Sequence, residues 1–275
     1  MKKKKYCAII LNRNLPKVTN RLYKNLKDNN SNLDVYVLES GSDKNKISRH
    51  CTWYANWKSA LKNGLRYSRG MNFALSKLDA ENKIDNYEAF ILLSNDTEFN
   101  NYSITGKIQS ILKKHDKIGI LSPCSKNWGE YQLLKKNKTK YFWFIHNSAY
   151  IITKKFLNAV KNKSKKPYMD YFFDGSNFRG YGSEFDIILK AYSNDFSAAI
   201  TSEIIAEENT SYLLNSSKII KTDNYEENLN RYIKEGETWL KKKYGFSDKW
   251  SINMTVKLFY DKFFEYYPQL KNYKI

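Results

Sequence analysis

The chain has 275 residues, of which 41% are hydrophobic and 16% aromatic, which is enough for one large domain with or without an extension. Its three cysteines, Cys7, Cys51 and Cys124, lie far apart without CxxC spacing. This argues against a disulfide framework and a zinc site, and for a reducing compartment. No stretch approaches the roughly 20 apolar residues that span a bilayer, so we expect a cytoplasmic protein that reaches a membrane only peripherally, at the inner face of the plasma membrane.

The formal net charge of +19 has two interpretations. One is a soluble surface rich in lysine. The other is an anionic partner, which would be a substrate, an anionic membrane surface or nucleic acid. The lysines are dispersed, and the sequence shows no helix-turn-helix, zinc-finger or RNP-type motif. We therefore expect no nucleic-acid partner, with a basic nucleic-acid-binding protein as the alternative class.

The first half of the chain alternates apolar runs with segments of helical periodicity. Strands are expected at 6–11, 33–40, 87–94 and 118–123, and helices at 17–29, 69–79 and 104–114. This alternation is typical of an α/β protein with a mainly parallel central sheet flanked by helices.

The second half is less regular. Residues 141–160 predict one or two strands and a helix, and 168–192 predict an aromatic, glycine-rich loop and a helix that begins near Ser183 as its N-cap. A strand is expected at 196–208, and helices from about 222. We expect a catalytic domain over 1–215 and a helical extension over 216–275.

Polar clusters follow three of the predicted strands. These clusters are Asn12-Arg13-Asn14, Glu39-Ser40-Gly41-Ser42 and Asn95-Asp96-Thr97. If the strands are parallel, their carboxyl ends meet at one edge of the sheet, which is where ligands bind in such folds.

Five segments together resemble the family-2 glycosyltransferases, which have the GT-A fold. The segments are AIILNRN (8–14), VYVLESGSDKN (35–45), NGLRYSRGMNFALSKL (63–78), ILLSNDT (91–97) and GYGSEFDIILKAY (180–192). The resemblance covers roughly residues 5 to 210 and implies a nucleotide-sugar donor with a divalent metal on its diphosphate. UDP is the commonest nucleotide in the family, with dTDP and GDP open.

The resemblance also assigns roles to individual residues. The residues that it implies for the nucleotide sugar are Asn12, Arg13, Glu39, Ser40, Arg69, Asn72, Asn95 and Asp96. Asp96 would bind Mn²⁺ or Mg²⁺, and Glu184 would deprotonate the acceptor hydroxyl. The chemistry agrees, because a poor hydroxyl nucleophile needs a nearby base and a hard cation suits a diphosphate leaving group. Direct displacement needs no covalent nucleophile, so we expect an inverting enzyme.

The sequence departs from the family pattern at three places. Ser94 stands where an acidic or amide residue precedes the metal-binding aspartate, and IIAEENTSY (204–212) lacks the histidine that many relatives present. Glu207 or Glu208 could replace that histidine as an oxygen ligand, and we predict Glu208. The late motif reads Ser183-Glu184-Phe185-Asp186 where relatives often have two adjacent acids, so Asp186 is the second choice for the catalytic base.

The acceptor is expected to be a glycan or lipid-linked glycan of a bacterial surface polysaccharide. Trp143, His146 and Asn147 are its candidate contacts, because sugars stack on aromatic rings and bond to amides. A purely structural His146 is the simpler alternative. The extension either packs on the core or contacts an anionic membrane or acceptor.

Each assignment has a simpler alternative. Asp96 could be an ordinary turn residue, and Glu184 a favourable charge at a helix N-terminus. At the level of function, the alternatives are a nucleotidyltransferase and a catalytically silent scaffold of the same fold. The nucleotidyltransferase is disfavoured because the first turn, NRNLP, has no glycine.

Overall fold

A computed structural model describes residues 5–134, 138–145, 149–162, 166–209, 211, 225–246 and 248–275. The strands are β1 (Tyr6–Asn12), β2 (Leu33–Glu39), β3 (Trp53–Tyr54), β4 (Ala89–Ser94), β5 (Thr97–Phe99), β6 (Ile118–Cys124), β7 (Thr139–Tyr141), β8 (Ala149–Thr153) and β9 (Ser197–Glu208). The α-helices are α1 (Pro16–Asn29), α2 (Lys58–Asn63), α3 (Arg66–Ala80), α4 (Thr105–Lys114), α5 (Gly129–Leu133), α6 (Lys154–Val160), α7 (Ser183–Tyr192), α9 (Tyr225–Tyr244) and α10 (Lys249–Tyr266). Short 3-10 helices occupy Lys44–Lys46, Ile84–Asn86 and Pro268–Tyr273.

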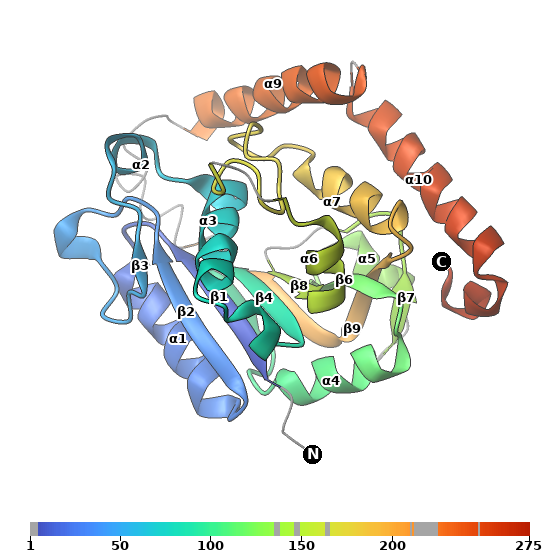
Figure 1. The fold of residues 1–275 in the computed structure, drawn as a ribbon, viewed down its shortest axis with the longest axis horizontal. Coiled ribbons are helices and arrows are strands. Elements are labelled where there is room, and N and C mark those ends of the chain that lie inside the picture. The colour runs from blue at the N-terminus through green and yellow to red at the C-terminus, as the bar shows by residue number, and fades with distance from the viewer. Residues whose placement is uncertain are drawn as a thin grey trace.

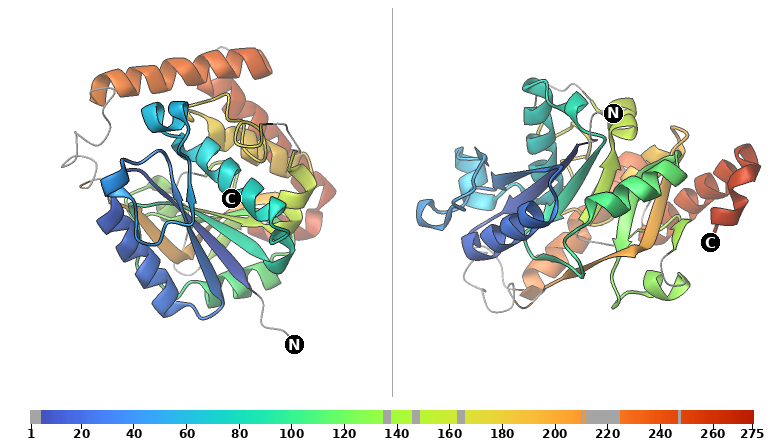
Figure 2. Two further views of the ribbon diagram at one scale, coloured as in Figure 1. Left: turned by 60° about the vertical axis from the view of Figure 1, so that its left-hand side comes forward. Right: turned by 90° about the horizontal axis from the view of Figure 1, so that it is seen from below.

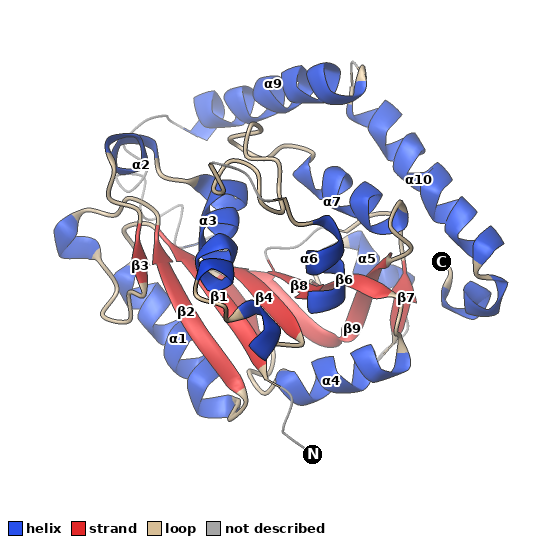
Figure 3. Ribbon diagram, in the orientation of Figure 1, coloured by secondary structure: helices blue, strands red, loops and turns tan. Residues whose placement is uncertain are grey.

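The strands form one curled, mixed sheet with helices on both faces (Figures 1 and 3). Its order is β3-β2-β1-β4-β8-β6-β9-β5, and β7 also pairs with β9. β1 runs parallel to β2 and β4, whereas β8 is antiparallel to both of its neighbours, β4 and β6. The α/β class and the flanking helices are thus as predicted, with an antiparallel strand inside the sheet.

Burial explains why these apolar runs are strands. β1 and β4 are buried along almost their whole length, as expected for strands that are covered on both faces. α1 begins with Pro16 at its first turn, where a missing N–H costs nothing. It turns Leu22 and Leu26 inward against β2.

The parallel registers bring three strand ends to one edge of the sheet. Asn12 pairs with Glu39 across β1 and β2, and Leu11 pairs with Ser94 across β1 and β4. The connections on the two sides of β1 use opposite faces, with α1 on one face and α3 on the other (Figure 3). Such a change of direction opens a crevice beyond the strand ends.

The helix α7 begins differently from the prediction. Ser183 is its first residue, and the N-cap position belongs to Gly182, whose φ of 77° is left-handed. A serine N-cap needs an extended backbone, and the glycine turn before α7 supplies a left-handed one. Glu184 and Asp186 still lie in the first turn, as expected.

The C-terminal helices α9 and α10 run along the outside of the molecule (Figures 1 and 2). α10 buries Ile252, Val256, Tyr260, Phe263 and Phe264, which recur every three or four residues and therefore share one helical face. This helix packs against α7. The predicted boundary at residues 215 and 216 lies outside the described residues.

Within the described part of the chain, no helix combines the length and the apolar character needed to cross a membrane.

Candidate functional site

A hydrogen-bond network joins the ends of β1, β2 and β4. The Asn12 side chain donates to both carboxylate oxygens of Glu39, at 2.9 Å each. Asn95 donates to the Asn12 side-chain oxygen, also at 2.9 Å. The expectation that these three polar clusters meet at one edge is confirmed.

The Glu39 carboxylate is fully buried in this strand-end network. It also accepts hydrogen bonds from the Ser42 hydroxyl at 2.5 Å and from the Ser48 backbone N–H at 2.8 Å. The neighbouring Ser40 hydroxyl accepts from the backbone N–H of Leu65 at 2.7 Å. Four donor contacts satisfy a buried carboxylate, so the geometry gives Glu39 and Ser40 a structural part in holding the edge together.

Arg13 lies at the end of α2. Its guanidinium donates to the carbonyl oxygens of Leu61 and Lys62 at 3.4 and 3.2 Å, where a helix leaves carbonyls without partners. Gly64 follows with a left-handed φ of 71°, and a Cβ there would lie 2.0 Å from Arg13 Nη1. Burial lowers the pKa of the Arg13 guanidinium. Arg13 thus caps a helix beside the strand-end network.

Asn72 and Arg69 hold the loop that precedes α7. The Asn72 side chain accepts from the backbone N–H groups of Phe172 and Phe173 at 3.0 and 2.8 Å and donates to the Phe173 carbonyl at 2.8 Å. Arg69 donates to the carbonyl of Gly175 at 2.7 Å. Both side chains are therefore engaged with the loop backbone, and neither lines the cavity described next.

A cavity of about 370 Å³ lies beside the end of β4. We call it the Glu184 cavity. It brings together Ser94, Glu184 and Glu208, which are 24 or more residues apart in the sequence. The other lining residues are Tyr67, Ser68, Trp128, Tyr150, Arg179, Gly180, Ser183, Tyr232 and Lys249.

Asp96 lies next to this cavity, in the turn between β4 and β5. It is 4% exposed, and its Oδ1 atom is buried without a hydrogen-bond partner among the described residues. Burial raises the pKa of Asp96, against a smaller opposing effect of a hydrogen bond from Ser94. The simple description of Asp96 as a turn residue is correct, but the orphaned buried oxygen is unusual for a turn.

Strand pairing brings Glu208 to Asp96. Thr97 of β5 pairs with Glu208 of β9, and the Asn209 backbone N–H donates to the Asp96 carbonyl at 3.0 Å. The residue Glu208 is exposed as a whole, but its carboxyl group is partly removed from water. This desolvation raises the pKa of Glu208, and the negative charge of Asp96 raises it further. Two carboxylates with like charges repel each other, and a cation between them can stabilise both.

The donors at Asp96 and Glu208 fit a hard divalent ion. Carboxylate oxygens suit Mg²⁺ and Mn²⁺, and Mg²⁺ often uses one or two carboxylates plus substrate phosphates. No cluster of three or more His, Cys, Asp or Glu side chains suited to a metal occurs among the described residues. Glu207 is engaged elsewhere, since it accepts from the Lys126 backbone N–H at 2.7 Å and from the Ser125 hydroxyl.

Glu184 projects from the first turn of α7 into the cavity. Its side chain is 13% exposed, and its Oε1 lies 3.5 Å from Lys249 Nζ at the start of α10. Burial raises the pKa of Glu184, and the positive charge of Lys249 opposes that rise. A carboxylate whose pKa is raised is a stronger base when it is ionised, which suits proton abstraction near neutral pH.

Asp186 has different surroundings from Glu184. It is 2% exposed and makes ion pairs with Lys190 at 3.1 Å and Lys243 at 2.7 Å, and it accepts a hydrogen bond from Tyr244. Burial alone would raise its pKa, but the two lysines lower it overall. Asp186 therefore ties α7 to α9 and does not line the Glu184 cavity.

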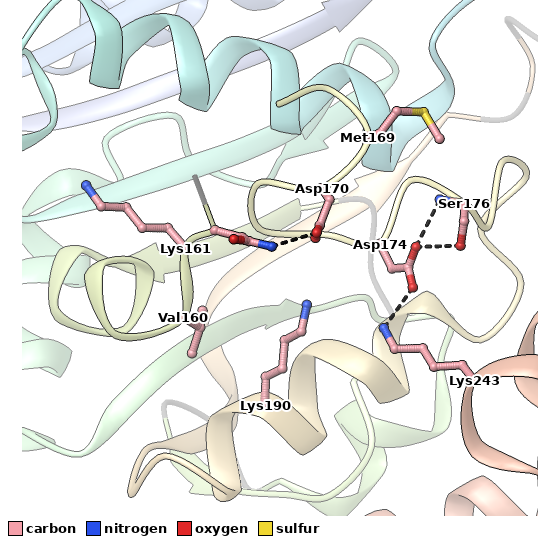
Figure 4. A pocket seen from close by; sticks show the side chains of 9 residues that line it. Val160, Lys161, Met169, Asp170, Asp174, Ser176, Lys190 and Lys243 are labelled. Carbon is pink, nitrogen blue, oxygen red and sulfur yellow. Dashed lines mark hydrogen bonds and ion pairs between the residues drawn. The ribbon is translucent and has the colours of Figure 1, made fainter. Parts of the chain in front are cut away.

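A second pocket borders this ion-pair cluster (Figure 4). Lys243 also reaches Asp174 there, at 2.8 Å, and Asp174 accepts from Ser176. Lys161, on the opposite wall, pairs with Asp79 at 2.9 Å. The lysines that line this second pocket are thus paired with carboxylates, so the pocket offers little net charge to a ligand.

The expected acceptor contacts are only partly described. Trp143 is half-buried, its ring is tilted against Phe142 and edge-on to Phe144, with ring centres 5.6 and 6.2 Å away, and it does not line the cavity. His146 and Asn147 lie outside the described residues.

Sequence reasoning missed most of the cavity wall. Arg179 lies five residues before Glu184, so proximity to that motif could have identified it. Tyr67 lies within the quoted segment 63–78, but nothing in its spacing marked it. For Tyr232 and Lys249, which come from the C-terminal helices, no sequence signal was available.

No protein-family model and no curated protein sequence matches the chain. Solved structures resemble it. The crystal structure of a mycobacterial protein aligns over 90% of this chain and 76% of its own, with a TM-score of 0.53 at 11% identity. The mannosyltransferase PcManGT from Pyrobaculum calidifontis, in complex with GDP-Man and Mn²⁺, aligns over 73% of this chain with a TM-score of 0.47 at 12% identity. TarS (residues 1–349) from S. aureus aligns over 89% of this chain and 75% of its own, with a TM-score of 0.45 at 14% identity.

These likenesses concern the fold alone. The chain spans 55% of the length of the Pyrobaculum protein. The α/β sheet with its flanking and C-terminal helices is consistent with a GT-A-like fold.

Proposed function

We propose that this protein is an inverting glycosyltransferase, which moves a sugar from a nucleotide-diphosphate donor to a hydroxyl of a glycan acceptor. One observation carries the proposal. Glu184, a largely buried carboxylate with a raised pKa, shares a cavity with Glu208, and strand pairing brings Glu208 near the buried carboxylate of Asp96. The cavity lies at the strand ends, where such sheets bind ligands.

Glu184 is the proposed general base. In a direct displacement, the acceptor oxygen forms a bond to the anomeric carbon of the donor while the bond from that carbon to the diphosphate oxygen breaks. The hydroxyl proton passes to Glu184, and the nucleoside diphosphate leaves with the bonding electrons. The acceptor oxygen attacks the face opposite the leaving diphosphate, so this single displacement inverts the configuration at the anomeric carbon, and it needs one base and no covalent nucleophile.

Asp96 and Glu208 are the proposed ligands of Mn²⁺ or Mg²⁺. A divalent ion, when bound, would neutralise the negative charge that grows on the leaving diphosphate. The pairing of β5 with β9 keeps Asp96 and Glu208 near each other, which supports this assignment. Arg179 and Lys249 add positive charge to the same cavity.

The cavity wall also suits a sugar. Tyr67, Trp128, Tyr150 and Tyr232 supply aromatic surface around the carboxylates. Sugar rings pack their apolar faces on such side chains while polar groups fix their orientation. Tyr232 and Lys249 belong to α9 and α10, so we propose that these helices form part of the catalytic unit.

Calorimetric titration of UDP, GDP and dTDP tests the donor site. Each nucleotide is titrated with and without Mn²⁺ against the wild type, Asp96→Ala and the control Asp116→Ala, which removes an exposed carboxylate before β6. We expect metal-dependent binding of one nucleotide to the wild type and the control, and its loss in Asp96→Ala. Absence of binding for all three nucleotides would contradict the proposal and favour a silent scaffold.

A further inference from the structure

A basic hollow lies beside the Glu184 cavity, on the outer helix α9. Its volume is about 570 Å³, and we call it the α9 hollow. Its lining residues are Ser176, Phe178, Arg231, Lys234, Glu235, Thr238, Trp239 and Lys242. Of these described residues, only Glu235 is acidic.

The periodicity of α9 directs its cations into this hollow. Arg231, Lys234 and Lys242 recur at helical spacing with Thr238 between them, so they lie along one face. All three side chains are exposed. These three cations outnumber the one carboxylate of the lining, Glu235, so the lining carries a net positive charge.

Three further arginines surround Phe178, which lines the hollow. Their guanidinium carbons lie 4.6 Å (Arg69), 5.7 Å (Arg66) and 5.9 Å (Arg179) from the centre of the Phe178 ring. Arg179 makes an ion pair with Glu235 of α9. Arg66 and Arg69 therefore add positive charge near Phe178, whereas Glu235 offsets the charge of Arg179.

The fold fixes α9 in this position. Arg66 and Arg179 both donate to the Asn228 side-chain oxygen, at 3.2 and 3.3 Å. A Cβ on Gly236 would lie 2.5 Å from the side chain of Tyr181, so only glycine allows the helix to approach this closely. The hollow is therefore a built feature of the fold.

The hollow and the Glu184 cavity are neighbours. Phe178 lines the hollow, and the next residue, Arg179, lines the cavity. Glu235 in the hollow pairs with the same Arg179. A chain molecule whose end lies at Glu184 can thus extend over Arg179 and onto α9.

We propose that the α9 hollow binds phosphate or carboxylate groups of an anionic acceptor glycan, whose reacting hydroxyl lies at Glu184. This assignment of the acceptor rests on the proposed transferase function. Lysine and arginine recognise such groups through charge-assisted hydrogen bonds. A single-stranded nucleic acid would need open aromatic platforms, whereas Trp239 is 6% exposed and bonded to Asp174, and Phe178 is half-buried among guanidinium groups.

The test is direct binding to the full chain at physiological salt. The probes are a glycerol-phosphate oligomer, an oligogalacturonate, the neutral maltohexaose and an oligothymidylate. The variant carries Arg231→Gln, Lys234→Gln and Lys242→Gln. The control carries Lys24→Gln, Lys113→Gln and Lys114→Gln, which removes the same net charge from exposed positions on α1 and α4, away from α9 (Figure 1).

We expect at least one of the two anionic glycans to bind the wild type and the control, and maltohexaose to bind neither. The hollow variant should weaken that binding on the order of tenfold or more. Binding of only the phosphate or only the carboxylate probe supports the proposal and names the group. Failure of both anionic glycans to bind, or equal weakening in the variant and the control, overturns it. Tighter binding of oligothymidylate, lost in the hollow variant, overturns it in favour of a nucleic-acid surface.

The same proteins also separate this proposal from the transferase itself. Nucleotide titration of the hollow variant should match the wild type, because none of its three positions lines the Glu184 cavity. If nucleotides fail to bind and the anionic glycans still bind, the transferase proposal fails and the anion site stands. The reverse result leaves the transferase and removes the anionic acceptor.

Discussion

Two groups of polar residues lie at the same edge of the sheet, and they differ in how completely they are hydrogen-bonded. In the strand-end network, both oxygens of the Glu39 carboxylate accept hydrogen bonds, from Asn12, Ser42 and Ser48. At the Glu184 cavity, Asp96 has an orphaned oxygen, and the pKa values of Asp96, Glu184 and Glu208 are all raised.

This difference in hydrogen bonding distinguishes carboxylates that stabilise the fold from carboxylates that are available for chemistry. A buried carboxylate that has all its donors stabilises the fold and offers nothing to a ligand. A buried carboxylate that lacks donors costs stability, and it is a candidate for a cation or a proton. The composition of the two groups is similar, so their surroundings alone distinguish them.

The largest effect is expected from Glu184→Gln, which removes the proposed base and keeps its shape. Turnover should fall by about 10²–10⁴-fold, while nucleotide binding stays near the wild-type level. The measurement is a transfer assay with the nucleotide class that calorimetry identifies. Glu237→Gln, an exposed position on α9, serves as the control. Undiminished turnover in Glu184→Gln would remove this residue from the chemistry.

The second effect concerns stability in the strand-end network. Glu39→Gln places an amide where the carboxylate now accepts four hydrogen bonds, so donors face donors. The free energy of unfolding should fall by about 3 kcal/mol, as measured by urea denaturation, with Asp116→Asn as the control. Unchanged stability together with lost nucleotide binding would instead make Glu39 a ligand-binding residue.

The third effect is an increase in stability, in contrast to the decrease expected for Glu39→Gln, and it occurs at Asp96. Because the pKa of Asp96 is raised above its ordinary value of 3.8, the folded state holds this proton more tightly than the unfolded state does. Its contribution to stability therefore decreases as the pH rises through the folded pKa. Asp96→Asn should remove that pH dependence and stabilise the metal-free protein by up to about 1 kcal/mol.

Thermal unfolding with and without Mn²⁺ completes the test at Asp96. The wild type should be stabilised by Mn²⁺ at neutral pH and less so in acid, because protonated carboxylates bind metal poorly. Asp96→Asn should show no such stabilisation. An equal Mn²⁺ effect in the two proteins would place the metal elsewhere.

The smallest effect is expected from Lys249→Gln. Removal of this cation, 3.5 Å from Glu184, raises the pKa of the base further. The acid limb of the pH–rate profile should move to higher pH, with less than about tenfold change in the maximal rate. Lys257→Gln, on the same helix but outside the cavity, is the control. An unshifted limb would show that Lys249 is only a packing residue.

The sequence by itself determined the α/β class and the positions of the main strands, because buried strands and amphipathic helices leave periodic patterns. It also predicted that Asn12, Glu39 and Asn95 meet, because parallel strands place their carboxyl ends together. The segment around Glu184 was identified through its resemblance to a known motif. The antiparallel β8 inside the sheet was not predicted, since a short apolar run carries no sign of its direction.

Only the tertiary structure decided which polar residues are satisfied and which are not. Residues of the same chemical type, such as Glu39 and Glu184, differ through partners that lie far away in the sequence, Asn12 for Glu39 and Lys249 for Glu184. The same holds for Tyr232 and Lys249, which reach the cavity because α9 and α10 pack against the loop before α7 and against α7 itself. Whether a polar side chain has all its hydrogen-bond partners depends on long-range contacts. The periodicity of a sequence reflects only the local chain, so it cannot predict those contacts.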